Sequence, residues 1–218
     1  NMGQIFYEQK QYDTALVLFQ ADTKFSKEEK LYDNAANSLQ WAARTQLRLG
    51  NTAIALQYVR EALGLLELTP EMFYLRNTYF AATDVFKTMG VYDSAFYYID
   101  FALAIETNEY FYQTKANYHQ DLGEHQLAIH YYNKALKINP NLTNVYLQRG
   151  FCYLTNNQID NALKDFAIAW QINSEEAKAY TNMNIQMGLL PTANQMCKFC
   201  ENQPLHIVKA IENLFCSI

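Results

Sequence analysis

Residues 196–200 read MCKFC and His206 follows, so this stretch holds residue types that bind zinc or exchange disulfides. A zinc tetrahedron needs four ligands, and Cys216 could supply the fourth beside Cys197, Cys200 and His206. Two cysteines at this spacing could also be a redox pair. Free cysteine, however, also packs as a small buried hydrophobe. Which of these applies depends on the elements that carry the residues.

No other stretch carries a recognisable catalytic pattern. The histidines are scattered, and the chain contains no GxSxG, glycine-rich phosphate loop or HExxH sequence. Glu28 and Glu29 are expected near a helix start, where carboxylates complement the helix dipole. We therefore predict no catalytic residue, no cofactor and no enzyme activity.

The composition excludes several classes of partner. Half of the 218 residues are hydrophobic and 18% are charged, which suits a folded chain with a substantial core. The net charge of −5 gives no general attraction for nucleic acid or anionic membranes, so neither is expected as a partner. No apolar run reaches the roughly 18–20 residues that span a bilayer. The first residues lack a signal-peptide pattern and four cysteines are too few for a disulfide framework, so a cytoplasmic location is the default expectation.

The chain repeats one helical frame along its length. Each copy has an anchor alanine, and the residues four and seven positions later share its helix face. The anchor alanines are Ala15, Ala55, Ala95, Ala128, Ala162 and Ala193. The residues four positions later are Phe19, Val59, Ile99, Tyr132, Phe166 and Cys197.

A first helix precedes each anchor alanine. Twelve residues before the alanine stands a small residue, as close helix packing requires: Gly3, Ala43, Thr83, Ala116, Gly150 or Thr181. Glycine or asparagine commonly ends a helix in the left-handed conformation, and five residues before the alanine stands Lys10, Gly50, Gly90, Gly123, Asn157 or Gly188. The pattern predicts antiparallel helix pairs.

This frame resembles the tetratricopeptide repeat, a helix–turn–helix unit of typically about 34 residues. The best match is NVYLQRGFCYLTNNQIDNALKDFAIAW, whose signature positions hold Tyr146, Gly150, Tyr153, Ala162, Phe166 and Ala169. The resemblance covers nearly the whole chain. It implies an all-α fold, a right-handed superhelical solenoid of about six antiparallel helix pairs with a C-terminal capping helix.

The resemblance also divides the chain into repeats. We expect one array over 1–202, with repeats at about 1–26, 27–69, 70–107, 108–140, 141–173 and 174–202. A capping helix is expected over 203–218, with an apolar stripe of Leu205, Val208, Ile211 and Phe215. The anchor alanines are 40, 40, 33, 34 and 31 residues apart. Similar lengthened repeats occur in bacterial sensor and regulator members of the family, and the incomplete first repeat leads us to expect further sequence upstream.

In this register, the cysteines of MCKFC occupy packing positions. Cys197 and Cys200 fall on the two inward positions of the sixth repeat's second helix, which hold Phe, Val, Tyr or Ala in other repeats. Core packing therefore explains both residues without chemistry, and we predict no metal site. Stoichiometric zinc in the purified protein would overturn this interpretation.

Family members generally bind peptide segments along the concave wall that their first helices form. Counting back 18, 15, 11 and 8 residues from the anchor alanines gives the wall positions of this chain. Amides there can pair with a peptide backbone, and aromatic rings can bury its apolar side chains. The residues expected to contact a partner are Asn37, Gln40, Arg44, Asn77, Phe80, Asp84, Lys87, Tyr110, Gln113, Asn117, Asn144 and Phe151. Arg44 is the only arginine among them, so the family's carboxylate clamp for chaperone C-termini is not reproduced.

The resemblance implies a non-catalytic module that binds an extended segment of a protein or peptide in the concave groove. The alternative is the ligand-sensing region of a larger bacterial signalling or transcription regulator, in which binding would reposition an output domain. A DNA-binding or kinase domain in the same gene would distinguish the two. Homo-oligomerisation through the terminal repeats stays open.

The repeat assignment makes a direct prediction about secondary structure. Circular dichroism should show a predominantly helical protein with negligible strand. More than a small fraction of β-structure would overturn the assignment.

Overall fold

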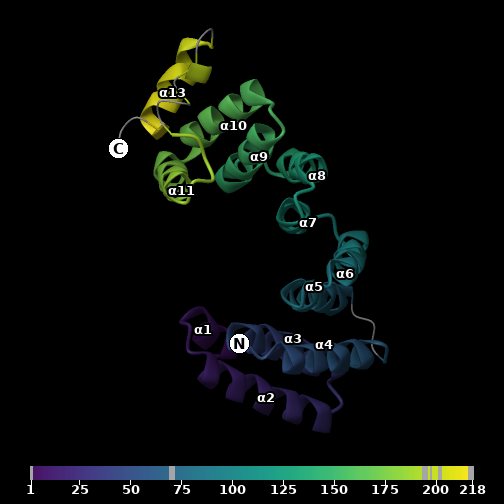
Figure 1. Cartoon of the computed structure of the whole chain (residues 1–218). Helices are drawn as coiled ribbons and strands as arrows, with labels where there is room; N and C mark the ends of the chain where they lie inside the picture. Colours follow the sequence, from purple (N-terminus) through teal and green to yellow (C-terminus); the bar gives the residue numbers. More distant parts are fainter. Residues whose placement is uncertain (1, 69–71, 193–195, 197, 201–202, 216–218) are drawn as a thin grey trace. The chain divides into compact units, whose positions relative to one another are not determined.

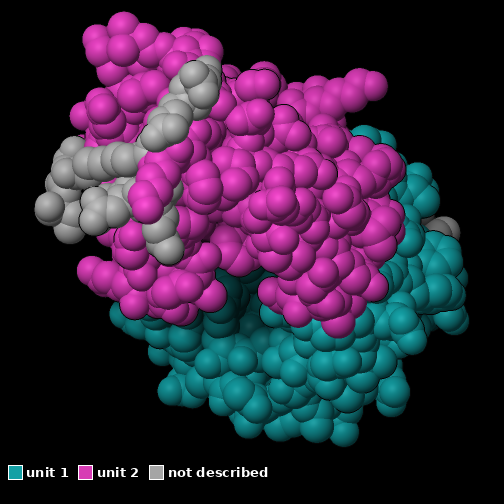
Figure 2. All heavy atoms as spheres, turned by 45° about the horizontal axis from the view of Figure 1, so that its top comes forward, with its two compact units in different colours: residues 1–107 teal, residues 108–218 magenta. Residues whose placement is uncertain are grey.

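All regular structure in the described chain is helical. The computed structural model describes residues 2–68, 72–192, 196, 198–200 and 203–215, and no strand occurs among them. These residues form two compact units, at 1–107 and 108–218 (Figure 2). The prediction of an all-α fold is therefore confirmed.

The helices follow one another in antiparallel pairs within each unit (Figure 1). Unit 1 contains α1 (Met2–Glu8), α2 (Tyr12–Glu28), α3 (Tyr32–Arg48), α4 (Thr52–Leu66), α5 (Met72–Thr88) and α6 (Tyr92–Ile105). Unit 2 contains α7 (Glu109–Asp121), α8 (His125–Ile138), α9 (Thr143–Thr155), α10 (Ile159–Ile172), α11 (Ser174–Gln186) and α13 (Leu205–Phe215). Part of the segment predicted as the partner of α11, including Ala193 and Cys197, lies outside the described residues.

The turns between paired helices were predicted correctly. The glycines and the asparagine at the predicted turn position all have a positive φ, as expected: Gly50 (81°), Gly90 (74°), Gly123 (75°), Asn157 (58°) and Gly188 (70°); Lys10 at the same position has one too (61°). The next amide then reaches back to the helix, as the N–H of Asn51 does to the carbonyl of Gln46 at 2.8 Å. This hydrogen bond satisfies a carbonyl that the end of the helix would otherwise leave without a partner.

One turn of the same kind was missed. Lys30, between α2 and α3, has a φ of 58°, and the N–H of Leu31 donates to the carbonyl of Ser26 at 2.7 Å. A lysine carries no sequence signal for this conformation. Because α2 continues to Glu28, Glu28 and Glu29 end a helix instead of beginning one, so the expectation for these two residues was wrong.

The long repeat intervals arise from longer helices. α2, α3 and α5 each contain 17 residues, whereas α7 and α9 contain 13. The difference is about one helical turn. The expected limit of the first repeat at residue 26 consequently falls inside α2.

Each helix pair closes where a large side chain of the second helix meets a small residue of the first. The ring of Phe166 is fully buried against Gly150, where a Cβ atom would lie 2.9 Å from the Cε1 atom of Phe166. Gly3 leaves the same space for the ring of Phe19. Ala116 and Tyr132 belong to one buried cluster in the same way. The small residue therefore sets how closely the two helices approach.

A buried ion pair adds a polar link between α9 and α10. Arg149 donates from Nε and Nη2 to the two carboxylate oxygens of Asp165, at 2.7 and 2.6 Å, and from Nη1 to Asn133 at 2.6 Å. Burial raises the pKa of Asp165, and the hydrogen bonds from Arg149 oppose that shift. Because the guanidinium of Arg149 and the carboxylate of Asp165 are hydrogen-bonded to each other, both charges can be buried between α9 and α10.

Helix α13 covers the last described helices of unit 2. It packs against α10 and α11, and the ring of Phe215 meets that of Phe166 edge-on, with centroids 5.8 Å apart. Ile211 and Phe215 of the expected stripe are buried and Val208 is half-buried. Leu205, in contrast, is 68% exposed. Ile207, Ala210 and Leu214 complete the buried face.

The close approach at Gly150 predicts opposite effects for one substitution at two sites. Gly150→Ala places a methyl group against the buried Phe166 ring and should lower the free energy of unfolding by about 1–3 kcal/mol. Gly64→Ala adds a methyl group to the exposed side of α4, where nothing lies within 4 Å, and should raise it by about 0.5–1 kcal/mol. Urea unfolding of both variants measures the difference. Equal effects would mean that Gly150 does not set the spacing of its helix pair.

Candidate binding faces of the first helices

Two first helices lie side by side in each unit, α3 and α5 in unit 1 and α9 and α11 in unit 2. We call the surface formed by α1, α3 and α5, or by α7, α9 and α11, the first-helix face of its unit. The predicted partner-binding residues all lie on α3, α5, α7 or α9. Asn77 lies on the first-helix face of unit 1, and Asn117 lies on that of unit 2.

Arg44 is the central charged group of the first-helix face of unit 1. Its guanidinium carbon lies 5.2 Å from the ring centroid of Trp41 and 5.5 Å from that of Phe80. Two cation–π contacts of this kind hold the planar cation in place. Its Nε atom is buried and has no hydrogen-bond partner among the described residues. A guanidinium held in this way can donate to a carboxylate of a ligand.

Gln40 lies one helical turn before Arg44 and is only 2% exposed. Its Nε2 donates to Oδ1 of Asn37 at 2.9 Å, while its Oε1 is buried without a hydrogen-bond partner in the described part of the chain. A buried donor and a buried acceptor, one turn apart on α3, thus lack protein partners. Water or the backbone of a bound segment can satisfy both.

Aromatic rings of the preceding helix pair, α1 and α2, hold the side chain of Trp41 in position. Its ring stacks on Phe19 of α2 at 6.1 Å and meets Tyr7 of α1 edge-on at 5.5 Å. The hydroxyl of Tyr7 in turn accepts a hydrogen bond from Nε of Arg48 at 3.2 Å. This bond is the main cause of the raised pKa of Arg48. Sequence reasoning missed Trp41 and Arg48, because their roles depend on rings that lie more than twenty residues earlier in the chain.

Helix α5 supplies the floor of the same face. Phe80 is 4% exposed, so it acts beneath Arg44 and does not itself present a surface to a ligand. Asn77 is half-buried, and its Oδ1 already accepts from Nε and Nη2 of Arg76 at 3.2 and 3.1 Å. Its amide N–H groups are therefore the part that can serve a ligand. Asp84 and Lys87 are half-buried at the end of the helix.

In unit 2, the predicted amide Asn117 has a structural contact. The buried hydroxyl of Tyr132 lies 2.7 Å from Oδ1 of Asn117 and 2.7 Å from Oε1 of Gln120. Burial raises the pKa of Tyr132 well above its ordinary value, so the hydroxyl keeps its proton. Asn117, which was predicted to contact a partner, is half-buried beside Tyr132 and therefore also supports the fold.

Cys152 on α9 extends this polar cluster. Its thiol lies 3.5 Å from Oε1 of Gln120, and burial raises the pKa of the thiol to about 12. The thiolate is therefore scarce at neutral pH.

The remaining predicted residues of unit 2 vary in exposure. Tyr110, at the start of α7, is 57% exposed. Gln113, Asn144 and Phe151 are half-buried. The ring of Phe151 meets His125 edge-on at 6.2 Å. The structure thus brings Asn37, Gln40, Arg44 and Phe80 together in unit 1, whereas the predicted residues of unit 2 are spread along their helices.

The MCKFC segment is partly described. Cys200 is buried in the same cluster as Met196, Leu214 and Phe215, which agrees with core packing for this residue. Cys197 and Cys216 lie outside the described residues, and His206 is exposed on α13. Within the described ranges, no group of three or more His, Cys, Asp or Glu side chains is placed to hold a metal ion. In the same ranges, no helix is both long and apolar enough to cross a membrane.

Part of unit 2 matches a known repeat family by sequence. Residues 110–142 and 131–164 match two models described as tetratricopeptide repeat, and together these matches span about a quarter of the chain. No curated protein sequence shows a significant match.

Several solved structures share the fold. The crystal structure of MamA has a TM-score of 0.63 at 20% identity and covers 82% of this chain and 98% of its own. YrrB, described as a TPR protein with an unusual peptide-binding site, has a TM-score of 0.60 at 20% identity, with coverage of 89% and 93%. The C-terminal part of a TPR repeat-containing protein from Cytophaga hutchinsonii has a TM-score of 0.66 at 15% identity, with coverage of 96% and 78%. At these identities, the likeness shows the fold alone.

Because Asn117 and Gln120 share the hydroxyl of Tyr132, substitutions of the two residues should have non-additive effects on stability. A hydroxyl has one proton, so either Asn117 or Gln120 can satisfy it alone. Asn117→Ala and Gln120→Ala should each lower the free energy of unfolding by less than about 1 kcal/mol. The double variant should lose about 1–3 kcal/mol, more than the sum, because the buried hydroxyl is then unsatisfied. Denaturant unfolding of the three variants tests this, and strictly additive losses would contradict a shared partner.

Proposed function

Because this chain is a tetratricopeptide-repeat protein, we propose that it is a non-catalytic module whose first-helix faces bind an extended segment of a partner protein. Repeats of this kind present the outer sides of their first helices as a binding surface. The type of partner is supported by YrrB, whose fold is similar and which is described as having a peptide-binding site.

The observation that carries this proposal is the state of Arg44. Its guanidinium lies close to the rings of Trp41 and Phe80, and its buried Nε has no hydrogen-bond partner among the described residues. A half-buried guanidinium with an unsatisfied donor favours an anionic ligand, since a carboxylate there would restore part of the solvation that burial removes. We infer that the bound segment places an Asp, a Glu or its own C-terminus against Arg44.

The amides around Arg44 fit the backbone of such a segment. Gln40 offers a buried acceptor and Asn77 offers N–H donors, so a peptide can both donate to α3 and accept from α5. On the separate first-helix face of unit 2, the exposed ring of Tyr110 and the half-buried ring of Phe151 offer apolar contacts to a bound segment. Under this proposal, recognition is mainly electrostatic in unit 1.

A charge-reversal experiment tests the role of Arg44. Short peptides selected from a random library on the wild-type chain should be enriched in acidic residues, with binding that weakens as salt rises. Arg44→Glu should weaken their binding at least about tenfold, which corresponds to about 1.4 kcal/mol. Arg44→Lys should retain part of the affinity, because it keeps the charge but loses the planar guanidinium. Isothermal calorimetry on synthetic copies of the selected peptides measures these changes.

Arg60→Glu is the matched control for this experiment. Arg60 is exposed on α4 of the same unit, so the substitution changes the net charge equally but leaves the first-helix face intact. Binding should be nearly unchanged in this variant. Equal losses of affinity in both variants would mean that the overall charge, and not a contact with Arg44, explains the effect. Unchanged affinity in Arg44→Glu would mean that Arg44 is not part of the binding site.

A further inference from the structure

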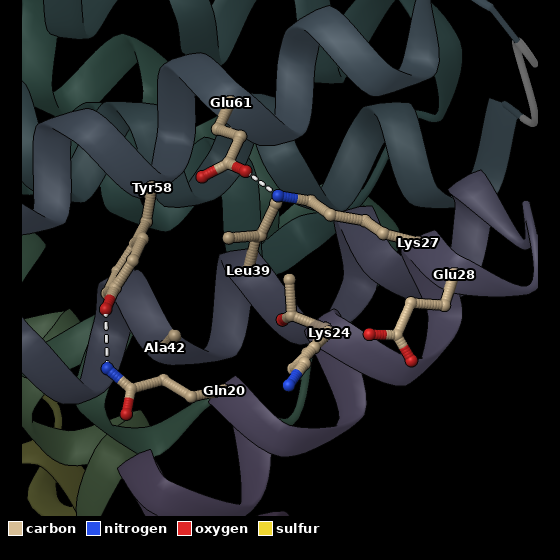
Figure 3. Close-up of a pocket in the computed structure, with 9 residues that line it drawn as sticks. Gln20, Lys24, Lys27, Glu28, Leu39, Ala42, Tyr58 and Glu61 are labelled. Carbon is tan, nitrogen blue, oxygen red and sulfur yellow. Dashed lines mark hydrogen bonds and ion pairs between the residues drawn. The ribbon is translucent and has the colours of Figure 1, made fainter.

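Unit 1 contains a pocket of about 370 Å³ between α2 and α4 (Figure 3). Leu39 and Ala42 of α3 form its floor. At about 100° per residue, these two positions lie roughly 140–160° around α3 from Arg44. The α2–α4 pocket is therefore separate from the first-helix face, and no sequence pattern predicted it.

The inner surface of the α2–α4 pocket is mostly apolar. Leu39 and Ala42 contribute methyl groups, and Tyr58 of α4 contributes its aromatic ring. The hydroxyl of Thr23 donates to the carbonyl of Phe19 at 2.7 Å, so the one hydrogen-bond donor of this side chain is used within α2. A group that enters the pocket thus meets few polar atoms in need of a partner.

Two side-chain bridges cross the gap between α2 and α4. Gln20 Nε2 donates to the hydroxyl of Tyr58 at 2.8 Å, and Lys27 forms an ion pair with Glu61 (Figure 3). Gln20 and Lys27 are seven residues apart on α2, so the opening between the bridges is roughly 10 Å long. An α-helix, about 10–12 Å across, cannot lie in this opening without breaking a bridge. A single side chain can enter it.

We propose that the α2–α4 pocket receives one apolar side chain, such as Leu, Phe or Trp, that projects from a partner protein. An apolar floor within a rim of satisfied polar pairs is the arrangement in which interface anchor residues bind. The pocket is open on its solvent side, so it cannot bury the 70–90% of surface that free small ligands typically lose. A side chain carried by a partner shares the entropy cost of binding with the rest of the interface.

The charges around the opening distinguish this site from Arg44. Lys24 and Glu28 stand on the α2 side and Lys27 pairs with Glu61, so the two signs balance. Binding in the pocket should therefore depend little on salt, whereas binding at Arg44 should weaken as salt rises.

The test uses the full chain carrying Arg44→Glu, so that the site of the proposed function is disabled. Peptides are selected from a random library on this chain, and their binding is measured by calorimetry before and after adding Lys24→Trp. An indole at position 24 can fold over the rim and occupy the pocket, because the Lys24 side chain already lines it. Lys164→Trp, on the exposed side of α10 in unit 2, is the matched control.

The proposal predicts that the selected peptides share an apolar anchor residue and bind with little dependence on salt. Lys24→Trp, or replacement of the anchor by alanine, should weaken binding at least about tenfold, and Lys164→Trp should leave it unchanged. Peptides that bind Lys24→Trp as well as its parent would overturn the proposal. So would a failure to select any peptide with an apolar anchor.

A second measurement covers the remaining outcome. Free indole is titrated against the chain while the methyl signals of Leu39 and Ala42 are followed by NMR. Shifts at these methyl groups, without any selected peptide, would assign the pocket to free small molecules and overturn the choice of a protein partner. Both the calorimetry and the NMR titration use the chain carrying Arg44→Glu. They therefore report binding in the pocket whether or not Arg44 binds a peptide in the wild-type chain.

Discussion

The fold depends on one repeated contact, in which a large second-helix side chain presses on a small first-helix residue. Gly150 under Phe166 and Gly3 under Phe19 are its clearest instances, since a Cβ at either glycine would overlap the ring. This contact brings two helix backbones close together and buries one side of each first helix. On α3 the half-buried Arg44 lies about 100° around the helix from this contact, on the first-helix face. The packing rule thus determines which residues a partner can meet.

The same rule explains which features could be predicted from the sequence. The small residues, the anchor alanines and the left-handed turn residues recur at fixed spacings, so the helix pairs follow from local pattern alone. Lys30 was missed because its turn is imposed by the ends of α2 and α3 and not by its own preference. The repeat spacing predicted that Arg44 lies on the first-helix face. It did not predict the position of Trp41, because the rings of Tyr7 on α1 and Phe19 on α2 determine that position. The α2–α4 pocket was missed for a similar reason, since its two bridges join residues 38 and 34 positions apart.

The two proposed sites of unit 1 use different physical interactions. Arg44 is costly to hold half-buried, and its two aromatic neighbours keep it in position before a ligand arrives. A ligand carboxylate then loses little freedom to a side chain that is already ordered, which favours binding. The α2–α4 pocket has balanced charges and an apolar floor, so burial of apolar surface would drive binding there. The opposite sides of α3 serve the two sites, which allows a partner to engage either one independently.

The claim that Arg44 meets a ligand is tested most directly by the NMR signal of its own Nε–H group. On addition of an acidic peptide selected on the wild-type chain, this signal should shift and exchange more slowly with water, because the guanidinium gains a carboxylate partner. The corresponding signal of Arg60, on the exposed side of α4, should stay in place. If the peptide binds while the Arg44 signal does not move, the first-helix face of unit 1 is not the binding site.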